Sequence, residues 1–184
     1  MRKLKLQMQI TVDGFVAGPE GQLDWMTWQM DEKGIELVNQ LVDTSDTILM
    51  GRKMTPGFVN YWESVKAGDP QYDFAQKMVN TPKVVFSRTV SSMEGKNVRV
   101  ENGDLVAAVN HLKSQSGKDL LVYGGASFVA SLLEHRLIDE LSLFVNPIAI
   151  HDGLRIFEAR TPLQLIDSVA YKNGKVVNTY KPRD

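Results

Sequence analysis

Two short apolar segments of this chain each run directly into glycine. Residues 47–53 read Thr-Ile-Leu-Met-Gly-Arg-Lys, and residues 120–127 read Leu-Leu-Val-Tyr-Gly-Gly-Ala-Ser. A short, continuously apolar run is typical of a β-strand that is covered on both faces of a sheet. Glycine lets the backbone approach a ligand closely, and a helix that begins after it offers free N–H groups to an anion. The two junctions therefore predict a phosphate-bearing ligand held at two points, for which a nucleotide cofactor is the natural candidate.

The rest of the chain alternates between strand-like and helix-like patterns. Apolar residues have helical spacing over residues 31–42, 104–113 and 128–137, and the expected strands cover residues 4–12, 47–50, 83–87, 97–100, 120–123, 141–145, 163–171 and 176–180. Asn173-Gly174 favours a tight hairpin turn between the last two strands. This order predicts an α/β fold with a mainly parallel central sheet flanked by helices and an antiparallel C-terminal hairpin. Right-handed crossovers would bring both glycine junctions to one edge of that sheet.

Size and composition exclude several classes of protein. The 184 residues predict a single domain over 1–184, and the formal net charge of −1 gives no reason to expect a nucleic-acid partner. No apolar run approaches membrane-spanning length, so no membrane partner is expected. The absence of cysteine excludes disulfides and thiolate metal sites, and the histidines are too far apart to suggest another metal site. We therefore expect a cytoplasmic protein, without a metal, that acts on a small molecule.

Cationic side chains follow two of the expected strands. Arg52 and Lys53 come directly after the first glycine junction, where we expect a helix to start. The start of a helix carries a partial positive charge that repels cations, and a bound anion would offset this repulsion. Ser87 and Arg88 end the strand 83–87, and a hydroxyl beside a guanidinium suits a phosphomonoester. The alternatives are solvated surface cations for the first pair and a polar loop for the second. The second glycine junction matches neither G-x-G-x-x-G nor a Walker loop, and its alternative is a tight turn between strand and helix.

Two carboxylates flank the first long loop. Asp13 precedes glycine and Asp24 precedes tryptophan, so either side chain is a candidate proton donor or substrate anchor. The alternatives are a turn former for Asp13 and a capping or loop acid for Asp24. Aromatic side chains are candidates either for a pocket that holds a flat heterocycle or for the core; they are Trp25, Trp28, Phe58, Tyr61 and Trp62.

Taken together, these segments resemble a known reductase family. The resemblance rests on residues 12–18, 23–25, 48–53, 84–89, 122–127 and 137–141, with Asn146-Pro147 completing the pattern, and it covers nearly the whole chain. In this order they are similar to the C-terminal reductase domain of the riboflavin-biosynthesis protein RibD, a member of the dihydrofolate reductase-like superfamily. The resemblance implies a three-layer fold of that type and an NADPH cofactor.

The resemblance also implies roles for individual residues. Gly51, Arg52 and Lys53 would meet the adenosine-side phosphates, and Ser87 and Arg88 would recognise the 2′-phosphate. The pyrophosphate would lie in the corner formed by Tyr123, Gly124, Gly125, Ala126 and Ser127, and the nicotinamide would lie near Val16 and Ala17. The family usually has Thr directly after Arg-Lys, whereas here Met54 intervenes before Thr55. The chain has no room for the zinc deaminase domain of the bifunctional riboflavin enzyme, so a general reductase role is favoured over a dedicated riboflavin role.

The resulting hypothesis is an NADPH-dependent reductase that transfers hydride to a carbonyl or imine carbon of a small, pyrimidine- or pterin-like substrate. The proton would come from Asp24, Asp13 or an ordered water, and the glycine-rich loop 14–25 would close over the site. A homodimer is implied by the resemblance, with the strand 141–145 either at its interface or in the core. Two alternatives are a non-catalytic nucleotide-binding or regulatory module on the same fold and a purely structural dimer that binds no nucleotide.

Overall fold

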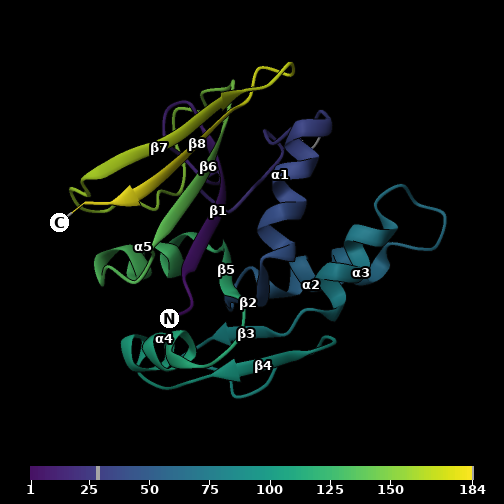
Figure 1. Ribbon diagram of the computed structural model, residues 1–184, viewed down its shortest axis with the longest axis vertical. Coiled ribbons are helices and arrows are strands. Elements are labelled where there is room, and N and C mark those ends of the chain that lie inside the picture. Colours follow the sequence, from purple (N-terminus) through teal and green to yellow (C-terminus); the bar gives the residue numbers. More distant parts are fainter. Residues whose placement is uncertain (28–29, 184) are drawn as a thin grey trace.

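The computed structural model describes residues 1–27 and 30–183; Trp28, one of the candidate pocket aromatics, lies outside them. Within these residues one eight-stranded sheet has the order β4-β3-β2-β5-β1-β6-β8-β7 (Figure 1). The strands are β1 (Leu4–Thr11), β2 (Ser45–Gly51), β3 (Lys83–Phe86), β4 (Val98–Glu101), β5 (Asp119–Gly124), β6 (Glu140–Asn146), β7 (Leu163–Ala170) and β8 (Val176–Pro182).

Six of these strands run parallel. β1 pairs in parallel with β5 and β6, β2 pairs with β3 and β5, and β3 pairs with β4. β8 pairs antiparallel with both β6 and β7. The predicted α/β fold with its parallel centre and antiparallel C-terminal hairpin is therefore confirmed. Because β6 lies between β1 and β8, the segment 141–145 belongs to the core.

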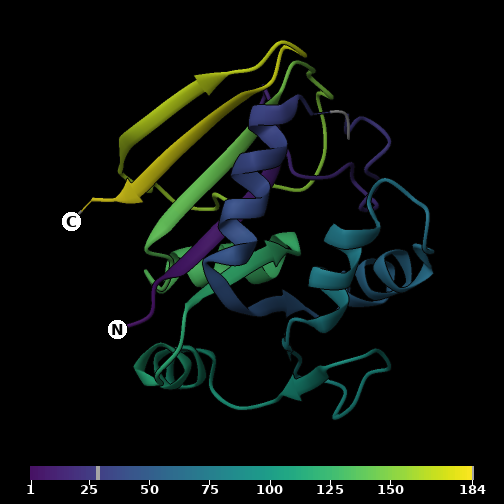
Figure 2. The same cartoon turned by 45° about the vertical axis from the view of Figure 1, so that its right-hand side comes forward.

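Five helices within the described residues cover the two faces of the sheet. α1 (Glu32–Asp43), α2 (Thr55–Ser64) and α3 (Tyr72–Asn80) lie on one side, and α4 (Leu105–Ser114) and α5 (Ala126–Glu134) lie on the other (Figure 1). α1 crosses the sheet in front of β1 and β6 (Figure 2). Asp31 and Asp104 are the N-cap residues of α1 and α4, because each carboxylate accepts a hydrogen bond from a backbone N–H three residues later. Three layers result, with one apolar core on each face of the sheet.

The sequence patterns did not predict α2 and α3. α2 opens with Thr-Pro-Gly, and glycine and proline have poor intrinsic helix propensity. Aromatic packing holds the two helices together instead: the ring centroids of Phe58 and Trp62 are 6.2 Å apart, and those of Trp62 and Phe74 are 5.3 Å apart. Phe58 also lies 5.4 Å from Tyr123 of β5. Phe58 and Trp62 are therefore half-buried side chains that pack against the core, which agrees better with the core alternative for them.

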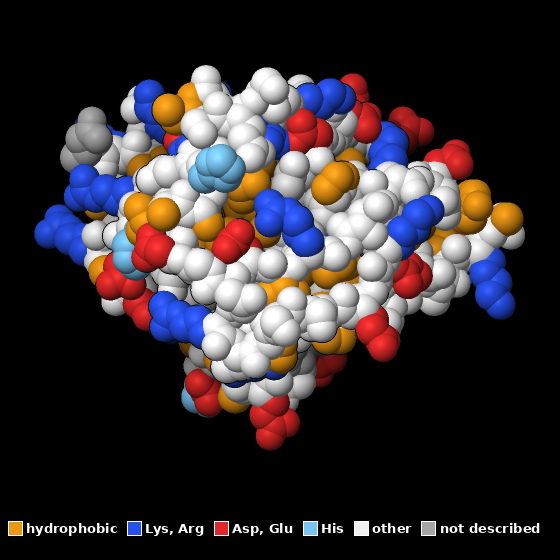
Figure 3. Space-filling model, turned by 90° about the horizontal axis from the view of Figure 1, so that it is seen from below, with side chains coloured by type: hydrophobic (Ala, Val, Ile, Leu, Met, Phe, Trp, Pro, Cys, Tyr) orange, Lys and Arg blue, Asp and Glu red, His pale blue; other side chains and the backbone are white. Residues whose placement is uncertain are grey.

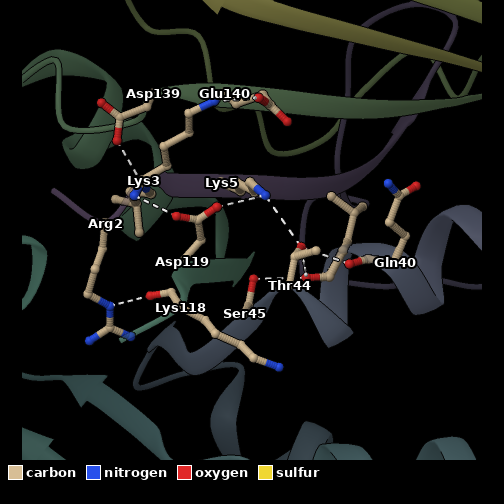
Figure 4. A network of polar contacts seen from close by, with 12 residues as sticks. Arg2, Lys3, Lys5, Gln40, Thr44, Ser45, Lys118, Asp119, Asp139 and Glu140 are labelled. Atoms are coloured by element: carbon tan, nitrogen blue, oxygen red, sulfur yellow. Dashed lines mark hydrogen bonds and ion pairs between the residues drawn. The ribbon is translucent and has the colours of Figure 1, made fainter. Parts of the chain in front are cut away.

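Ion pairs close the amino-terminal edge of the sheet. Lys5 of β1 pairs with Asp119 of β5 at 2.8 Å, and Arg2 donates a hydrogen bond to the carbonyl of Lys118 (Figure 4). Arg2 also donates to the carboxylate of Asp46. These contacts tie the start of the chain to two other segments, at Asp46 and at residues 118–119. In the view from below, basic and acidic side chains alternate on the surface, with small hydrophobic areas between them (Figure 3).

Lys83 is a buried cation at the start of β3. Its Nζ donates hydrogen bonds to the carbonyl oxygens of Met78, Val79 and Thr81 at distances of 2.8, 3.0 and 2.7 Å. Two of these carbonyls belong to α3, so the side chain caps the end of that helix. Burial lowers the pKa of Lys83 from 10.5 to about 8.

This pKa predicts a pH dependence of stability. Between pH 8 and 10.5 the unfolded chain binds more protons than the folded chain, so the free energy of unfolding should rise with pH in this window. We expect a rise of about 1–2 kcal/mol after allowing for partial solvent screening, and we expect Lys83→Met to lack it. Urea unfolding of both proteins across the window measures the difference. An identical pH dependence in the two proteins would contradict this account.

Candidate cofactor site

The two glycine corners lie side by side at the carboxyl edge of the sheet. Met50 pairs with Gly124, which places the end of β2 directly beside the end of β5. A Cβ atom on Gly51 would lie 3.5 Å from the backbone nitrogen of Gly125 and only 2.9 Å from the Cβ of Phe128. Glycine is therefore required at position 51 for α5 to pack against β2. This close approach also brings the two corners together.

The start of α5 leaves backbone donors available. Its N-cap is Gly125, which has no side chain to bond the first N–H groups of the helix, and no other side chain of the described residues caps it. Ser127 is exposed in this first turn, and Ala126 is half-buried. The uncapped N–H groups and the helix dipole together suit a negatively charged group.

Arg52 and Lys53 lie in a turn rather than in the first turn of a helix. α2 begins only at Thr55, so the sequence-based placement of these cations at a helix start was wrong by a few residues. The Oγ1 of Thr55 donates to the carbonyl oxygen of Gly51 at 3.1 Å, and this fully buried hydroxyl fixes the turn. Within the part of the chain that the structure describes, neither Arg52 nor Lys53 forms an ion pair. Both charges are therefore available to a ligand.

The end of β3 reaches the same edge. Phe86 stacks on Phe128 of α5 with ring centroids 5.0 Å apart, which joins this strand to the second glycine corner. Ser87 is buried, and its Oγ accepts hydrogen bonds from the backbone nitrogens of Thr89 and Val90, both at 3.1 Å. This hydroxyl therefore shapes the loop and still has its own proton to donate. Arg88 is exposed.

Val16 and Ala17 are held by a second loop. The backbone N–H of Val16 donates to the carbonyl oxygen of Leu154 at 2.9 Å, and the backbone N–H of Leu154 donates to the carbonyl oxygen of Ala17 at 2.8 Å. Both side chains are buried, so a cofactor ring would meet the loop backbone here. A Cβ atom on Gly153 would lie 2.1 Å from the carbonyl oxygen of Ala17, so no larger residue fits at that position.

Asp13 fastens these two loops together. Its Oδ1 accepts from the hydroxyl of Thr11 at 2.5 Å, and its Oδ2 accepts from the backbone nitrogens of Ile150 and His151 at 3.1 and 2.8 Å. The hydrogen bond from Thr11 and those from the backbone lower the pKa of Asp13, although slight desolvation opposes them. A carboxylate held in its charged form is poorly suited to donate a proton. The geometry therefore favours an anchoring role for Asp13.

Asp24 and its neighbour differ sharply in exposure. Asp24 is exposed in a turn, whereas the Trp25 side chain is buried and its Nε1 has no hydrogen-bond partner among residues 1–27 and 30–183. The hydroxyl of Tyr123 is likewise buried without a described partner, and burial raises its pKa.

The sequence patterns missed the contribution of residues 148–155, because only the folded chain brings that loop onto Val16 and Ala17.

An open cleft lies at the opposite, amino edge of the sheet. It encloses about 490 Å³ and is lined by Val42, Asp43, Ser45, Asp46, Asp73, Gln76, Lys77, Asn80, Thr81, Pro82 and Lys118. Two of its acids are already engaged, since Asp43 pairs with Lys77 at 2.7 Å and Asp46 pairs with Arg2. The carboxyl edge is the stronger candidate site because its cations form no ion pair with residues 1–27 or 30–183, and no described side chain caps its helix amides. Among the described residues no cluster of side chains could hold a metal ion, and no helix is long and apolar enough to span a membrane.

Comparison with known proteins agrees with this architecture. The family model of the RibD C-terminal domain matches residues 2–177. The chain belongs to the RibD C-terminal domain family. Among solved structures, a putative riboflavin biosynthesis protein from Shewanella sp. PV-4 is similar with a TM-score of 0.74 and 21% identity, and 99% of each chain is covered. A pyrimidine reductase-like protein from Corynebacterium diphtheriae is similar with a TM-score of 0.68 and 16% identity, over 100% of this chain and 93% of that one.

Further relatives of this RibD-type domain differ in length. The bifunctional deaminase and 5-amino-6-(5-phosphoribosylamino)uracil reductase of Thermotoga maritima is similar with a TM-score of 0.66 and 16% identity, but the present chain spans only 57% of it. Two curated proteins of Bacillus subtilis (strain 168) match nearly end to end. The uncharacterized protein YyaP is 29% identical over 97% of this chain and 94% of its own length, and the uncharacterized protein YwjB is 26% identical over 87% and 85%.

Proposed function

We propose that this RibD-type domain is an NADPH-dependent reductase of a small, pyrimidine- or pterin-like heterocycle. The observation that carries the proposal is the uncapped start of α5 lying against Gly51, with the unpaired cations Arg52 and Lys53 following directly and Arg88 at the end of the neighbouring strand. The residues fit a doubly anchored dinucleotide: helix amides suit the pyrophosphate, and guanidinium groups suit the additional phosphate of NADP.

In this proposal the cofactor supplies the hydride for a carbonyl or imine carbon, and the protein orients the two reactants and excludes water. The paired loops at Val16 and Leu154 give the nicotinamide side of the site a rigid wall. Asp13 fastens that wall, which leaves Asp24 or an ordered water as the proton donor. The segment from Gly14 to Trp25 acts as the cover of the site.

A titration of the protein with NADPH tests the first half of the proposal. We expect a saturable change in nicotinamide fluorescence at submillimolar cofactor, with weaker binding of NADH because it lacks the 2′-phosphate. Absence of any saturable signal would remove the reductase assignment and favour a purely structural dimer.

A turnover assay tests whether the protein transfers hydride, and it distinguishes a reductase from a non-catalytic nucleotide-binding module. NADPH oxidation is followed with pyrimidine and pterin substrates, which include ribosylaminopyrimidines. Protein that binds NADPH but oxidises none with any of them would favour the non-catalytic nucleotide-binding or regulatory module.

The edge strand β7 supports the proposal of a homodimer. It pairs with β8 on one side only, and Leu165 and Ile166 are 52% and 54% exposed on it. An edge strand with exposed apolar side chains is a template for pairing with another chain. Light scattering should therefore give a dimer mass for the wild type and a monomer mass for Ile166→Lys. A monomeric wild type would contradict this part of the proposal.

A further inference from the structure

Strand β1 is polar on the face that it presents to α1. Lys5 pairs in register with Leu121, which packs in the same core as Val38 and Leu41 of α1, so Lys5 lies on the α1 side. The alternation of a strand places three further residues on that side, namely Gln7, Gln9 and Thr11. A central parallel strand normally carries apolar residues on both faces. A local departure of this kind is expected where a ligand binds.

Buried polar atoms without partners gather around this face. Gln7 and Asn146 are 7% and 1% exposed, and their Oε1 and Oδ1 have no hydrogen-bond partner among the residues that the structure describes. The same holds for the hydroxyl of Tyr123. Leu6 pairs with Val122, so Gln7 lies beside Tyr123 on the next strand. Buried polar groups are normally hydrogen-bonded, so a bound ligand could supply the hydrogen bonds that these atoms lack.

Lys175 places a positive charge within this cluster. It is 2% exposed, and its Nζ donates to the Oε1 of Gln9 at 3.3 Å and to the carbonyl oxygen of Thr27. The same Oε1 accepts from the Nδ2 of Asn146 at 3.0 Å, which joins the lysine to the polar face of β1. Within residues 1–27 and 30–183 no carboxylate forms an ion pair with Lys175. Burial of an unpaired ammonium is unfavourable, and burial lowers its pKa.

We infer that Lys175 and the polar face of β1 form a ligand subsite for a planar nitrogen heterocycle that carries one carboxylate. A single buried ammonium balances one negative charge, which favours a carboxylate over a phosphate dianion. The ring supplies N–H donors to Gln7 and Asn146, and its carboxylate accepts from Lys175. The inference rests on the proposed function for its place beside the cofactor, because Tyr123 joins this face to the second glycine corner.

Uracil and orotate are matched probes for this subsite, because they share a ring and differ by one carboxylate. Calorimetric titration of the cofactor-free protein should show orotate binding about tenfold more tightly than uracil, as one charge-assisted hydrogen bond predicts. Lys175→Met should abolish this preference. Lys172→Met is the control, because it removes an exposed charge from the same hairpin and should leave the preference intact.

A second variant keeps the test decisive if Lys175→Met fails to fold. Gln9→Glu has nearly the same shape and keeps both hydrogen bonds that the Oε1 accepts, but it gives Lys175 a carboxylate partner. It should raise the melting temperature of the ligand-free protein by about 2–4 °C and remove the preference for orotate. Both changes follow from satisfying the same unpaired ammonium.

Equal binding of the two probes, a preference that survives Gln9→Glu, or binding of neither probe would overturn the inference. NADPH is absent from these titrations, so their outcome is independent of cofactor binding. Saturable NADPH fluorescence without any preference for orotate would reject the carboxylate subsite alone. A preference for orotate without NADPH binding would instead reject the reductase proposal and leave a binding site for anionic heterocycles.

Discussion

The double variant Arg52→Ala/Arg88→Ala should weaken NADPH binding by about 100- to 10,000-fold, since each charge-assisted hydrogen bond to phosphate contributes about 1.5–3 kcal/mol. Neither arginine has a protein ion-pair partner among the described residues, so their removal should leave the fold intact. Binding of NADH should fall less, because it lacks the 2′-phosphate. Fluorescence titration with both cofactors, together with a melting curve, measures these effects.

A charge-matched control separates specific contacts from net charge. Arg160→Ala/Lys172→Ala removes two exposed cations outside the glycine corners, and it should leave NADPH affinity within about twofold of the wild type, as expected when surface charges are screened by salt. If both double variants bound NADPH as the wild type does, the assignment of the carboxyl edge as the cofactor site would be wrong.

The second large effect concerns Gly153. Replacing it with alanine would place a Cβ atom 2.1 Å from the carbonyl oxygen of Ala17, so the paired loops would have to separate. We expect the free energy of unfolding to fall by about 3–4 kcal/mol, because losses of this size are typical of a severe steric conflict. Urea unfolding measures this loss.

Gly21→Ala is the matched control for this substitution. Gly21 also has a positive φ, of +91°, but a Cβ atom there would meet nothing within 4 Å. Its replacement should cost only about 1 kcal/mol, from backbone strain alone. Equal losses in the two variants would show that strain, and not the contact with Ala17, explains glycine at position 153.

The parallel sheet was predictable because β2, β3 and β5 contain short apolar runs with clear boundaries. The start of α1 was predictable too, since Asp31 and the helical spacing behind it mark the first turn. The helices α2 and α3 were not, because the Thr-Pro-Gly opening of α2 has poor helix propensity and contacts between aromatic rings decide the outcome. Tertiary packing overrides local preference at that point.

The glycine corners were the part of the candidate site that the sequence predicted best. Their predicted place at one sheet edge follows from parallel strand order, and the register of Met50 with Gly124 agrees with it. The anchoring contacts of Asp13 were hidden, because its partners Ile150 and His151 lie more than a hundred residues away in the chain. One signal for the polar face was present in the sequence: β1 alternates strictly between apolar and polar residues, which is unusual for a central strand.

Backbone amide chemical shifts recorded during a titration with NADP⁺ test most directly whether the carboxyl edge holds the cofactor. The account predicts that the largest shifts fall on residues 51–53, 87–88 and 124–127, with smaller shifts at Val16 and Ala17. The large cleft at the amino edge, which Asp43, Asp73 and Lys118 help to line, should remain unaffected. Shifts confined to that cleft, or no shifts at saturating NADP⁺, would contradict the account.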